Sequence, residues 1–400
     1  MDDIFEKEIK KETIFQDRNV LSPHYIPETL PHREKEVEKI MKNLAPLLSG
    51  KRTNNLFIYG KTGTGKTAST KLVVEKLVNV KEKYKVNVDI IYINARVINT
   101  KYQVLLKIIE HLEPKESYIG YPFSHLYDKM LKTISKKNEH VIVILDEIDK
   151  IKSLDDLVYT LTRANDELPN GRLSIIGITN NVMMKKKLDP RSKSTLCEEE
   201  MIFAPYNAEQ LEDILKQRAE KGFKEKTVKE SAISYASALA AQESGDARYA
   251  LKLLLKAGEI ADEKGEKEVT DEDVLKARKG VEEEIVMEAI NTLPEHQKIM
   301  LYSIALLSKS KAHYSRLDGT HEDKILFTGE IYEKYEELCN QLGKDPRSAR
   351  WGKEYINELE MLGLVTTTLS GKGVRGNTTL VRLAFSPDKI KNAIEKYFKE

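Results

Sequence analysis

The stretch that most constrains the fold is GKTGTGKT at Gly60–Thr67, between an apolar run at Leu56–Tyr59 and a helical pattern at Thr67–Val78. Its spacing is GxxxxGK[ST]. Glycines at 60, 63 and 65 let backbone N–H groups turn toward phosphate oxygens, which side chains would obstruct. The following helix adds the positive end of its dipole. A strand, a glycine-rich turn and a helix in this order predict an α/β fold that binds a nucleoside triphosphate.

Two residues of this stretch are predicted to act on the phosphates directly. Lys66 reaches the β- and γ-phosphates, and the Thr67 hydroxyl is a ligand for Mg²⁺. The loop residues expected to hold the nucleotide are Gly60, Lys61, Thr62, Gly63, Thr64, Gly65, Lys66, Thr67 and Ala68.

A second stretch, VIVILDEID at Val141–Asp149, supplies carboxylates. Asp146 follows five consecutive apolar residues, and a carboxylate at the end of a buried strand needs a partner such as Mg²⁺. Glu147 is then placed to orient or deprotonate the attacking water. An acidic cluster that caps a helix has the same composition, but the phosphate loop favours the catalytic interpretation.

Short apolar runs alternate with helical patterns between residues 56 and 203, which is typical of a parallel sheet covered on both faces. The expected strands are Leu56–Tyr59, Val88–Ile93, Val141–Leu145, Leu173–Ile178 and Met201–Phe203. Pro205 ends the pattern, and Asn207–Gly280 shows only helical periodicity. We therefore predict three domains: a sheet-based ATPase domain with an N-terminal arm (1–204), a helical lid (205–281) and a third domain (282–400).

Bulk composition is compatible with these domains and selects no partner. The net charge of +1 neither demands nor excludes nucleic acid, because binding needs a local basic face. Two cysteines are too few for a disulfide framework. No apolar run approaches the roughly 18 residues of a membrane span. We expect a cytoplasmic, nucleoid-associated protein without a membrane partner.

The C-terminal region has the outline of a winged helix. A helix after Pro346 places Trp351, Tyr355, Ile356, Leu359 and Leu362 on one half and basic residues on the other, and a glycine-tipped hairpin follows. The residues predicted to contact double-stranded DNA are Arg347, Arg350, Lys353, Lys372 and Arg375. A solvated basic face on a protein-binding domain is the alternative.

The motifs together resemble the AAA+ ATPases, and more narrowly the archaeal replication initiators similar to origin recognition complex subunit 1 and cell division control protein 6. The stretches that carry the resemblance are YIPETLPHRE (25–34), YGKTGTGKT (59–67), ILDEID (144–149), IIGITNN (175–181), LDPRSKSTL (188–196), APYNAEQLEDILKQRAE (204–220) and SGDARYAL (244–251). They extend over nearly the whole chain.

The resemblance implies further site residues. Asn180 matches the sensor 1 position near the γ-phosphate, and Arg248 matches sensor 2, where a lid arginine contacts that phosphate. Tyr206 and Arg218 match positions that touch the nucleotide. With Lys66 and Glu147, Asn180 and Arg248 make up the expected catalytic set for ATP hydrolysis to ADP.

The resemblance also implies partners: origin DNA, the replicative helicase, and further copies or relatives in an oligomer on DNA. In this family a helical insertion between the second strand and the next element also contacts DNA, and Asn94–Gly120 resembles it. Tyr102, beside Lys101, is the candidate contact there, whereas Val104, Leu105, Ile108 and Ile109 are expected in the core.

One departure from the wider AAA+ pattern concerns arginine fingers. Arg191 is the candidate to act on a neighbour's ATP, and Ser194 and Thr195 stand where relatives carry a second arginine. We therefore expect the isolated subunit to hydrolyse ATP slowly. Two other interpretations stay open: a clamp-loader ATPase, which would have a helical collar at its C-terminus, and a signalling NTPase whose winged helix regulates transcription.

Overall fold

A computed structural model describes residues 13–181, 183–309, 313–315, 321–323, 325–369 and 379–399. The chain divides into two compact units, Met1–Arg278 and Lys279–Glu400. Within the described ranges, no helix is both long and apolar enough to cross a membrane.

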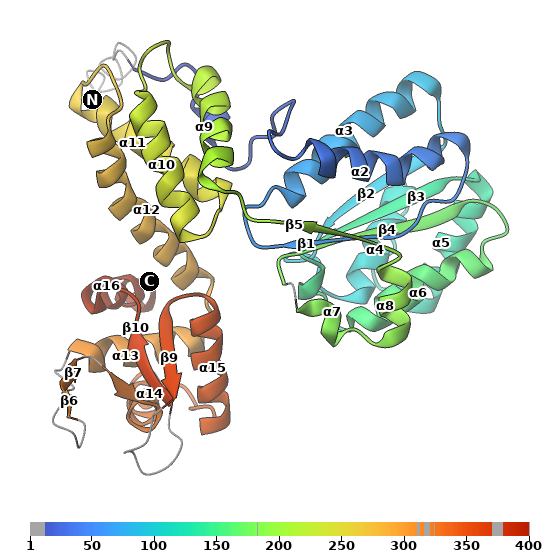
Figure 1. Cartoon of the computed structure of the whole chain (residues 1–400). Helices are drawn as coiled ribbons and strands as arrows, with labels where there is room; N and C mark the ends of the chain where they lie inside the picture. The colour runs from blue at the N-terminus through green and yellow to red at the C-terminus, as the bar shows by residue number, and fades with distance from the viewer. Residues whose placement is uncertain are drawn as a thin grey trace, which may run out of the picture. The chain divides into compact units, whose positions relative to one another are not determined.

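The first unit is built on a five-stranded parallel sheet in the order β2-β3-β4-β1-β5 (Figure 1). The strands are β1 (Leu56–Gly60), β2 (Val88–Asn94), β3 (His140–Asp146), β4 (Arg172–Thr179) and β5 (Glu199–Phe203). Each contains a predicted apolar run, so the predicted fold class is confirmed. Because the strands are parallel, the segments after β1, β3 and β4 emerge at the same edge of the sheet, where the predicted site residues lie.

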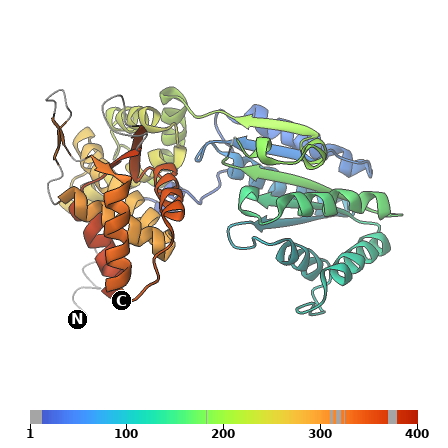
Figure 2. The ribbon, with the colours of Figure 1, turned by 90° about the horizontal axis from the view of Figure 1, so that it is seen from below.

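Helices cover both faces of this sheet, as in Figure 1 and Figure 2. Residues of β3 alternate between the two cores: Ile142 and Ile144 face one, and Val143 and Leu145 face the other. The first core is closed by η2 (Ala45–Ser49), α2 (Glu34–Leu44) and α3 (Lys66–Tyr84). The second is closed by α4 (Lys101–Leu112), α5 (Phe123–Lys137), α6 (Leu154–Glu167) and α8 (Pro190–Leu196). Short helices η3 (Ile148–Lys150) and α7 (Met184–Lys187) lie in the connections.

The lid helices are α9 (Ala208–Gly222), α10 (Glu230–Glu243), α11 (Ala247–Lys264) and the first part of α12 (Asp271–Thr292). Breaks predicted at Gly222, Gly245 and Gly265 coincide with helix ends. The helix α12 continues past residue 281, where the lid was predicted to end. The three domain boundaries stay predictions.

Residues 13–33, which we call the N-terminal segment, fall in the predicted sheet domain with its N-terminal arm (1–204), and their first half packs on the lid. The Ile14 N–H donates to Asp262 Oδ1 at 2.9 Å. The Phe15 ring stacks on Phe223 with centroids 4.7 Å apart. Leu21 in η1 (Arg18–Leu21) is fully buried beside Gly222, where a Cβ would lie 2.8 Å from Leu21 Cγ. The first half of the N-terminal segment is therefore packed on the lid helices.

The second unit is a winged helix. Its three-stranded sheet has the order β8-β10-β9, with β10 antiparallel to both neighbours. Its elements are α13 (Glu295–Lys309), β8 (Leu326–Phe327), α14 (Thr328–Gln341), α15 (Ala349–Met361), β9 (Val365–Leu369), β10 (Thr379–Leu383) and α16 (Pro387–Lys399). The strands β6 (His313–Ser315) and β7 (His321–Asp323) pair with each other. The helix α15 and the strands β9 and β10 were predicted, whereas β6, β7, β8 and α16 were not.

The predicted apolar half of α15 is only partly buried. Ile356 and Leu359 are buried, but Trp351 is 55% exposed and Leu362 is also exposed. The inner face centres on Gly352, where a Cβ would lie 3.0 Å from the Tyr332 ring. At about 100° per residue, Trp351 is turned away from that centre.

Candidate nucleotide and nucleic-acid sites

The phosphate loop connects β1 to α3 and takes a backbone conformation that glycine permits. Gly63 and Gly65 have φ of 70° and 91°, in the region that other residues rarely adopt. A Cβ at Gly63 would overlap the Asp246 carboxylate, and one at Gly65 would lie 2.7 Å from the Tyr206 hydroxyl. The glycines therefore allow both the turn and the close approach of the lid.

Lys66 begins α3 and is only 4% exposed. Its Nζ donates to Gly60 O at 2.9 Å and to Lys61 O at 2.6 Å. Burial, and then the positive charge of Arg248, lower the pKa of Lys66 to about 8. Among the described residues no carboxylate lies at hydrogen-bond distance from this ammonium group, so it is suited to an incoming phosphate.

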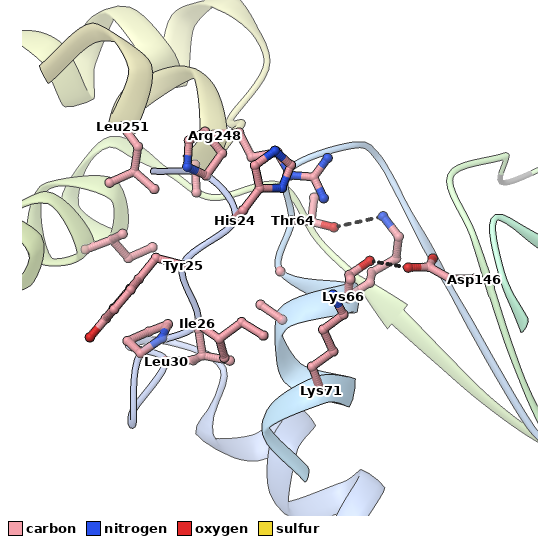
Figure 3. A pocket seen from close by; sticks show the side chains of 18 of the residues that line it. His24, Tyr25, Ile26, Leu30, Thr64, Lys66, Lys71, Asp146, Arg248 and Leu251 are labelled. Carbon is pink, nitrogen blue, oxygen red and sulfur yellow. Dashed lines mark hydrogen bonds between the residues drawn. The ribbon is translucent and has the colours of Figure 1, made fainter. Parts of the chain in front are cut away.

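Thr67 and Asp146 lie together, as the magnesium prediction requires. The Thr67 hydroxyl donates to Asp146 Oδ2 at 3.0 Å (Figure 3). The Tyr92 hydroxyl, from β2, donates to the same carboxylate oxygen. Burial, and then the Asp146 charge, raise the pKa of Tyr92 above its usual value, so Tyr92 remains a donor. A hydroxyl and a carboxylate are oxygen ligands of the kind that Mg²⁺ prefers, so these residues fit the ion.

Glu147 is held beside Asp146 in a left-handed backbone conformation, with φ 55° and ψ 44°. Such a conformation in a non-glycine residue carries strain and is common at functional sites. Its Oε2 pairs with Arg96 Nε at 2.8 Å. The carboxylate predicted to orient water is therefore restrained by a cation from the segment after β2.

Asn180 lies at the end of β4, beside β3, where the sequence prediction placed it. The preceding residue, Thr179, donates its hydroxyl to Asp149 Oδ1 at 2.6 Å, which links the DEID stretch to β4. This bond fixes the backbone from which Asn180 extends.

The lid closes directly on the phosphate loop. The Ala247 N–H, in the first turn of α11, donates to Gly63 O at 3.2 Å. Asp246 caps this helix through the Arg248 N–H at 2.7 Å. The Arg248 side chain is exposed and lines the same cavity as Lys66. Its predicted contact with the γ-phosphate is therefore compatible with its position.

These groups surround a cavity of about 360 Å³ (Figure 3). One end is lined by phosphate-loop residues, Asp146, Glu147, Asn180 and Arg248. The other end is lined by the N-terminal segment and by lid residues, including Pro23, Tyr25, Ile26, Leu30, Ile214 and Leu251. The polar end suits phosphates, and the apolar end has the character of a base-binding wall.

Arg218 and Tyr206, both predicted to touch the nucleotide, line the cavity but also have partners in the protein. Arg218 donates to Val20 O at 3.0 Å and to Tyr25 O at 3.1 Å. Its guanidinium lies 4.7 Å from the centre of the Tyr25 ring. Arg218 thus fixes the N-terminal segment as a wall of the cavity.

The predicted DNA-binding residues are only partly within the described structure. Arg350 and Lys353 are exposed in the first turns of α15, and Arg347 is exposed two residues before the helix. Lys372 and Arg375 fall in 370–378, outside the described residues. A basic group is therefore present on the outer face of α15.

The second DNA-contact candidate, around α4, is mainly core. Val104, Leu105, Ile108 and Ile109 are buried, as expected. Tyr102 is half-buried, and its hydroxyl accepts the Gly120 N–H at 3.2 Å. Its role toward DNA stays a prediction. So does the role of Arg191, which is exposed on α8.

Comparisons with known proteins agree with this architecture. Family models match as an AAA domain at 50–180, a Cdc6 AAA+ ATPase-type lid domain at 212–279 and a CDC6 C-terminal winged helix domain at 288–393. The ORC1-type DNA replication proteins of Thermococcus onnurineus and Pyrococcus abyssi are each 42% identical over 398 residues, covering 98% of this chain and 93% and 92% of theirs.

The chain belongs to the ORC1-type DNA replication protein family.

Solved structures support this assignment. The ORC1-type chain matches the Aeropyrum pernix ORC1 protein, solved in complex with DNA, with a TM-score of 0.83 and 39% identity over 96% of this chain and 97% of that one. CDC6P from Pyrobaculum aerophilum matches at 25% identity and a TM-score of 0.59, over 97% of this chain and 99% of that one. The resemblance drawn from the motifs is thus confirmed. A winged helix where a clamp loader would have its collar argues against the clamp-loader interpretation.

Sequence reasoning missed two residues of this ORC1-type site, Tyr92 and Arg96, and it included Arg33 only within the resembling stretch YIPETLPHRE (25–34), without a role of its own. Arg33 donates to the phosphate-loop carbonyl of Thr64. Tyr92 could have been found from the sequence, because it is on the same face of its strand as Asn94, and Asn94 pairs with Asp146 in the sheet. Arg96 is the one charged residue in the stretch NARVINT (94–100), and no spacing marks it.

Proposed function

We propose that this protein is an ATP-dependent initiator of DNA replication, which binds origin duplex and helps recruit or load the replicative helicase. One observation carries the nucleotide part: Lys66, Thr67, Asp146, Glu147, Asn180 and Arg248 line a single cavity. They come from distant parts of the sequence and from both the sheet domain and the lid. Family membership supports the replication role.

The proposed chemistry is ATP hydrolysis. Mg²⁺, held by Thr67 and Asp146, would neutralise charge on the phosphates. Loop N–H groups and Lys66 bind and orient the phosphates, and Asn180 and Arg248 lie near the γ-phosphate end. Glu147 orients the attacking water once its carboxylate leaves Arg96. Because phosphoryl transfer depends mainly on positioning and charge, these residues account for the proposed activity.

Lid contacts support a switch driven by nucleotide state. The phosphate loop touches the lid through Gly63 and Ala247, so a change at the γ-phosphate reaches α11 directly. We propose that ATP stabilises this closed arrangement and that hydrolysis acts as a timer. Slow turnover in the isolated subunit follows if Arg191 acts on a neighbour's ATP in a homo- or hetero-oligomer on DNA.

DNA binding is proposed for the winged helix. Arg350 and Lys353 are exposed on the outer face of α15, and a relative with 39% identity was solved in complex with DNA. Side chains on such a face reach the bases of a major groove, and basic residues around it contact phosphates.

The first test separates the nucleotide site from the rest of the proposal. Lys66→Ala should abolish ATP binding, whereas Glu147→Gln should retain binding and stop hydrolysis, as measured by calorimetry and phosphate release. Normal hydrolysis in both variants would show that the site is misassigned.

The second test addresses the biological role. Chromatin pull-down of the wild-type protein and of Glu147→Gln should give a peak centred on a replication origin, with occupancy that depends on ATP binding. Scattered promoter peaks would instead favour a winged-helix regulator of transcription.

A further inference from the structure

Arg33 is a buried cation at the junction of the phosphate loop, α2 and the lid connection. It is 4% exposed. Its Nε donates to Thr64 O at 2.8 Å, and one terminal nitrogen donates to Ala204 O at 2.5 Å. The other terminal nitrogen lies 3.3 Å from Glu36 Oε1. A side chain outside the cavity wall is thus attached to the loop that forms the wall.

The bond to Thr64 sets the orientation of a phosphate-loop peptide. A trans peptide is planar, so its C=O and N–H point in opposite directions. With Thr64 O directed at Arg33, the Gly65 N–H of the same peptide points away from Arg33, and Gly65 is one of the residues that line the cavity. Gly65 has a φ of 91° and can adopt several other orientations, so the loop needs an external restraint.

The bond to Ala204 attaches the same guanidinium to the connection between β5 and α9. Two residues further on, the Tyr206 ring lies 3.9 Å from the guanidinium carbon. The Tyr206 hydroxyl approaches Gly65 so closely that a Cβ there would lie 2.7 Å from it. Arg33 therefore holds the phosphate loop and the start of the lid in one arrangement.

We propose that Arg33 is a positioning residue, which directs the Gly65 N–H at the nucleotide phosphates and couples the loop to the lid connection. This inference rests on the proposed nucleotide site. The ion pair with Glu36 offsets part of the cost of burying this guanidinium, but it does not explain the bonds to Thr64 O and Ala204 O, because a packed apolar side chain would avoid that cost altogether.

Arg218 provides a matched control at the opposite end of the cavity. It is also a buried arginine that donates to two backbone carbonyls, those of Val20 and Tyr25. Both carbonyls belong to the N-terminal segment, which supplies the cavity wall expected to face the base. Loss of Arg33 should therefore weaken binding of phosphates, and loss of Arg218 should weaken binding of the nucleoside.

The experiment measures the affinities of the full-length protein for ATP and adenosine by calorimetry, with Mg²⁺ present. For Arg33→Met we expect ATP affinity to fall about tenfold or more, the effect of one lost hydrogen bond from a charged group, with adenosine affinity within about twofold of wild type. For Arg218→Met we expect the affinities for ATP and for adenosine to fall by the same factor. Equal losses for both ligands in Arg33→Met, or no loss for ATP, would overturn the proposal.

Hydrogen exchange of the nucleotide-free protein separates this inference from the proposed function. Arg33→Met should raise exchange in 61–67 and 204–207, and Arg33→Lys, which keeps one donor group, should raise it less. Unchanged exchange in both segments would refute the positioning role even if ATP binds.

If wild-type and Lys66→Ala proteins bind ATP equally, the nucleotide site itself is wrong. If Arg33→Met does not fold, Arg33→Lys alone decides, and wild-type exchange and ATP affinity in that variant would refute the proposal.

Discussion

Replacing Arg96 with alanine should accelerate the first round of ATP hydrolysis. In the structure the Arg96 guanidinium pairs with Glu147 Oε2 at 2.8 Å. If Glu147 orients the lytic water, this pair competes with the water for the carboxylate. Removing Arg96 removes the competitor and leaves the phosphate loop and Asp146 unchanged.

The size of the effect follows from exposure. The Arg96 side chain is 67% exposed and that of Glu147 is 22% exposed, so solvent screens the pair strongly. Pairs of this kind contribute about 0.2–1 kcal/mol. If the pair must break before the chemical step, Arg96→Ala should raise the single-turnover rate about 1.4- to 5-fold.

A rapid-quench assay with prebound ATP would measure this rate at low and high salt. The gain should shrink as salt increases, because screening already weakens the pair in the wild-type protein. Arg163→Ala, which removes an exposed pair with Asp166 at 2.7 Å on α6, is the control and should leave the rate unchanged. A tenfold fall in the single-turnover rate of Arg96→Ala would refute the reasoning and give Arg96 a direct role in the reaction. A gain in rate that does not change with salt concentration would also refute it.

Three further predictions concern the same sites. Tyr92→Phe removes the hydroxyl that donates to Asp146 and should raise the Mg²⁺ concentration for half-maximal ATP binding about tenfold. Tyr59→Phe, which loses a bond to Glu200 away from the loop, is the control and should leave this concentration unchanged. Equal effects of the two substitutions would contradict a magnesium role. The pKa of Lys66 is about 8 in the free protein, and bound phosphates should raise it. ATP affinity should therefore be full below pH 8 and fall about tenfold per pH unit above it, and Lys66→Arg should remove this slope. A flat profile of wild-type affinity against pH would contradict the assignment. Arg350→Ala should weaken duplex binding and flatten the log–log salt dependence by about 0.9, as measured by fluorescence anisotropy; an unchanged slope would remove Arg350 from the phosphate contacts.

The parallel sheet and the main groups of the site were predictable because local sequence determines them. β3 is apolar on both faces, and its end places Asp146 and Glu147 at the sheet edge whatever surrounds it. The phosphate loop needs glycine at fixed positions, so its spacing is visible in the sequence. Such features depend on neighbours within a few residues.

What escaped prediction depends on contacts distant in sequence. Arg33 and Ala204 are 171 residues apart, and nothing near either one reveals the bond. The exposure of Trp351 was not predicted because helical periodicity gives the apolar half of α15 but does not show that Gly352, with no side chain, lies at the centre of the buried face. In the short strand β8, only Leu326 and Phe327 pair with β10, which is too little sequence for an alternating pattern.

The attachment of the N-terminal segment to the lid affects how the chain can fold during synthesis. Ile14 and Asp262, which share a hydrogen bond, are 248 residues apart. At about 5–20 residues per second, a ribosome needs roughly 12–50 s to make the intervening chain. During that time Phe15 and Leu21 lack their native partners and expose apolar surface. These residues thus emerge long before the lid and reach their final place only after it has been made.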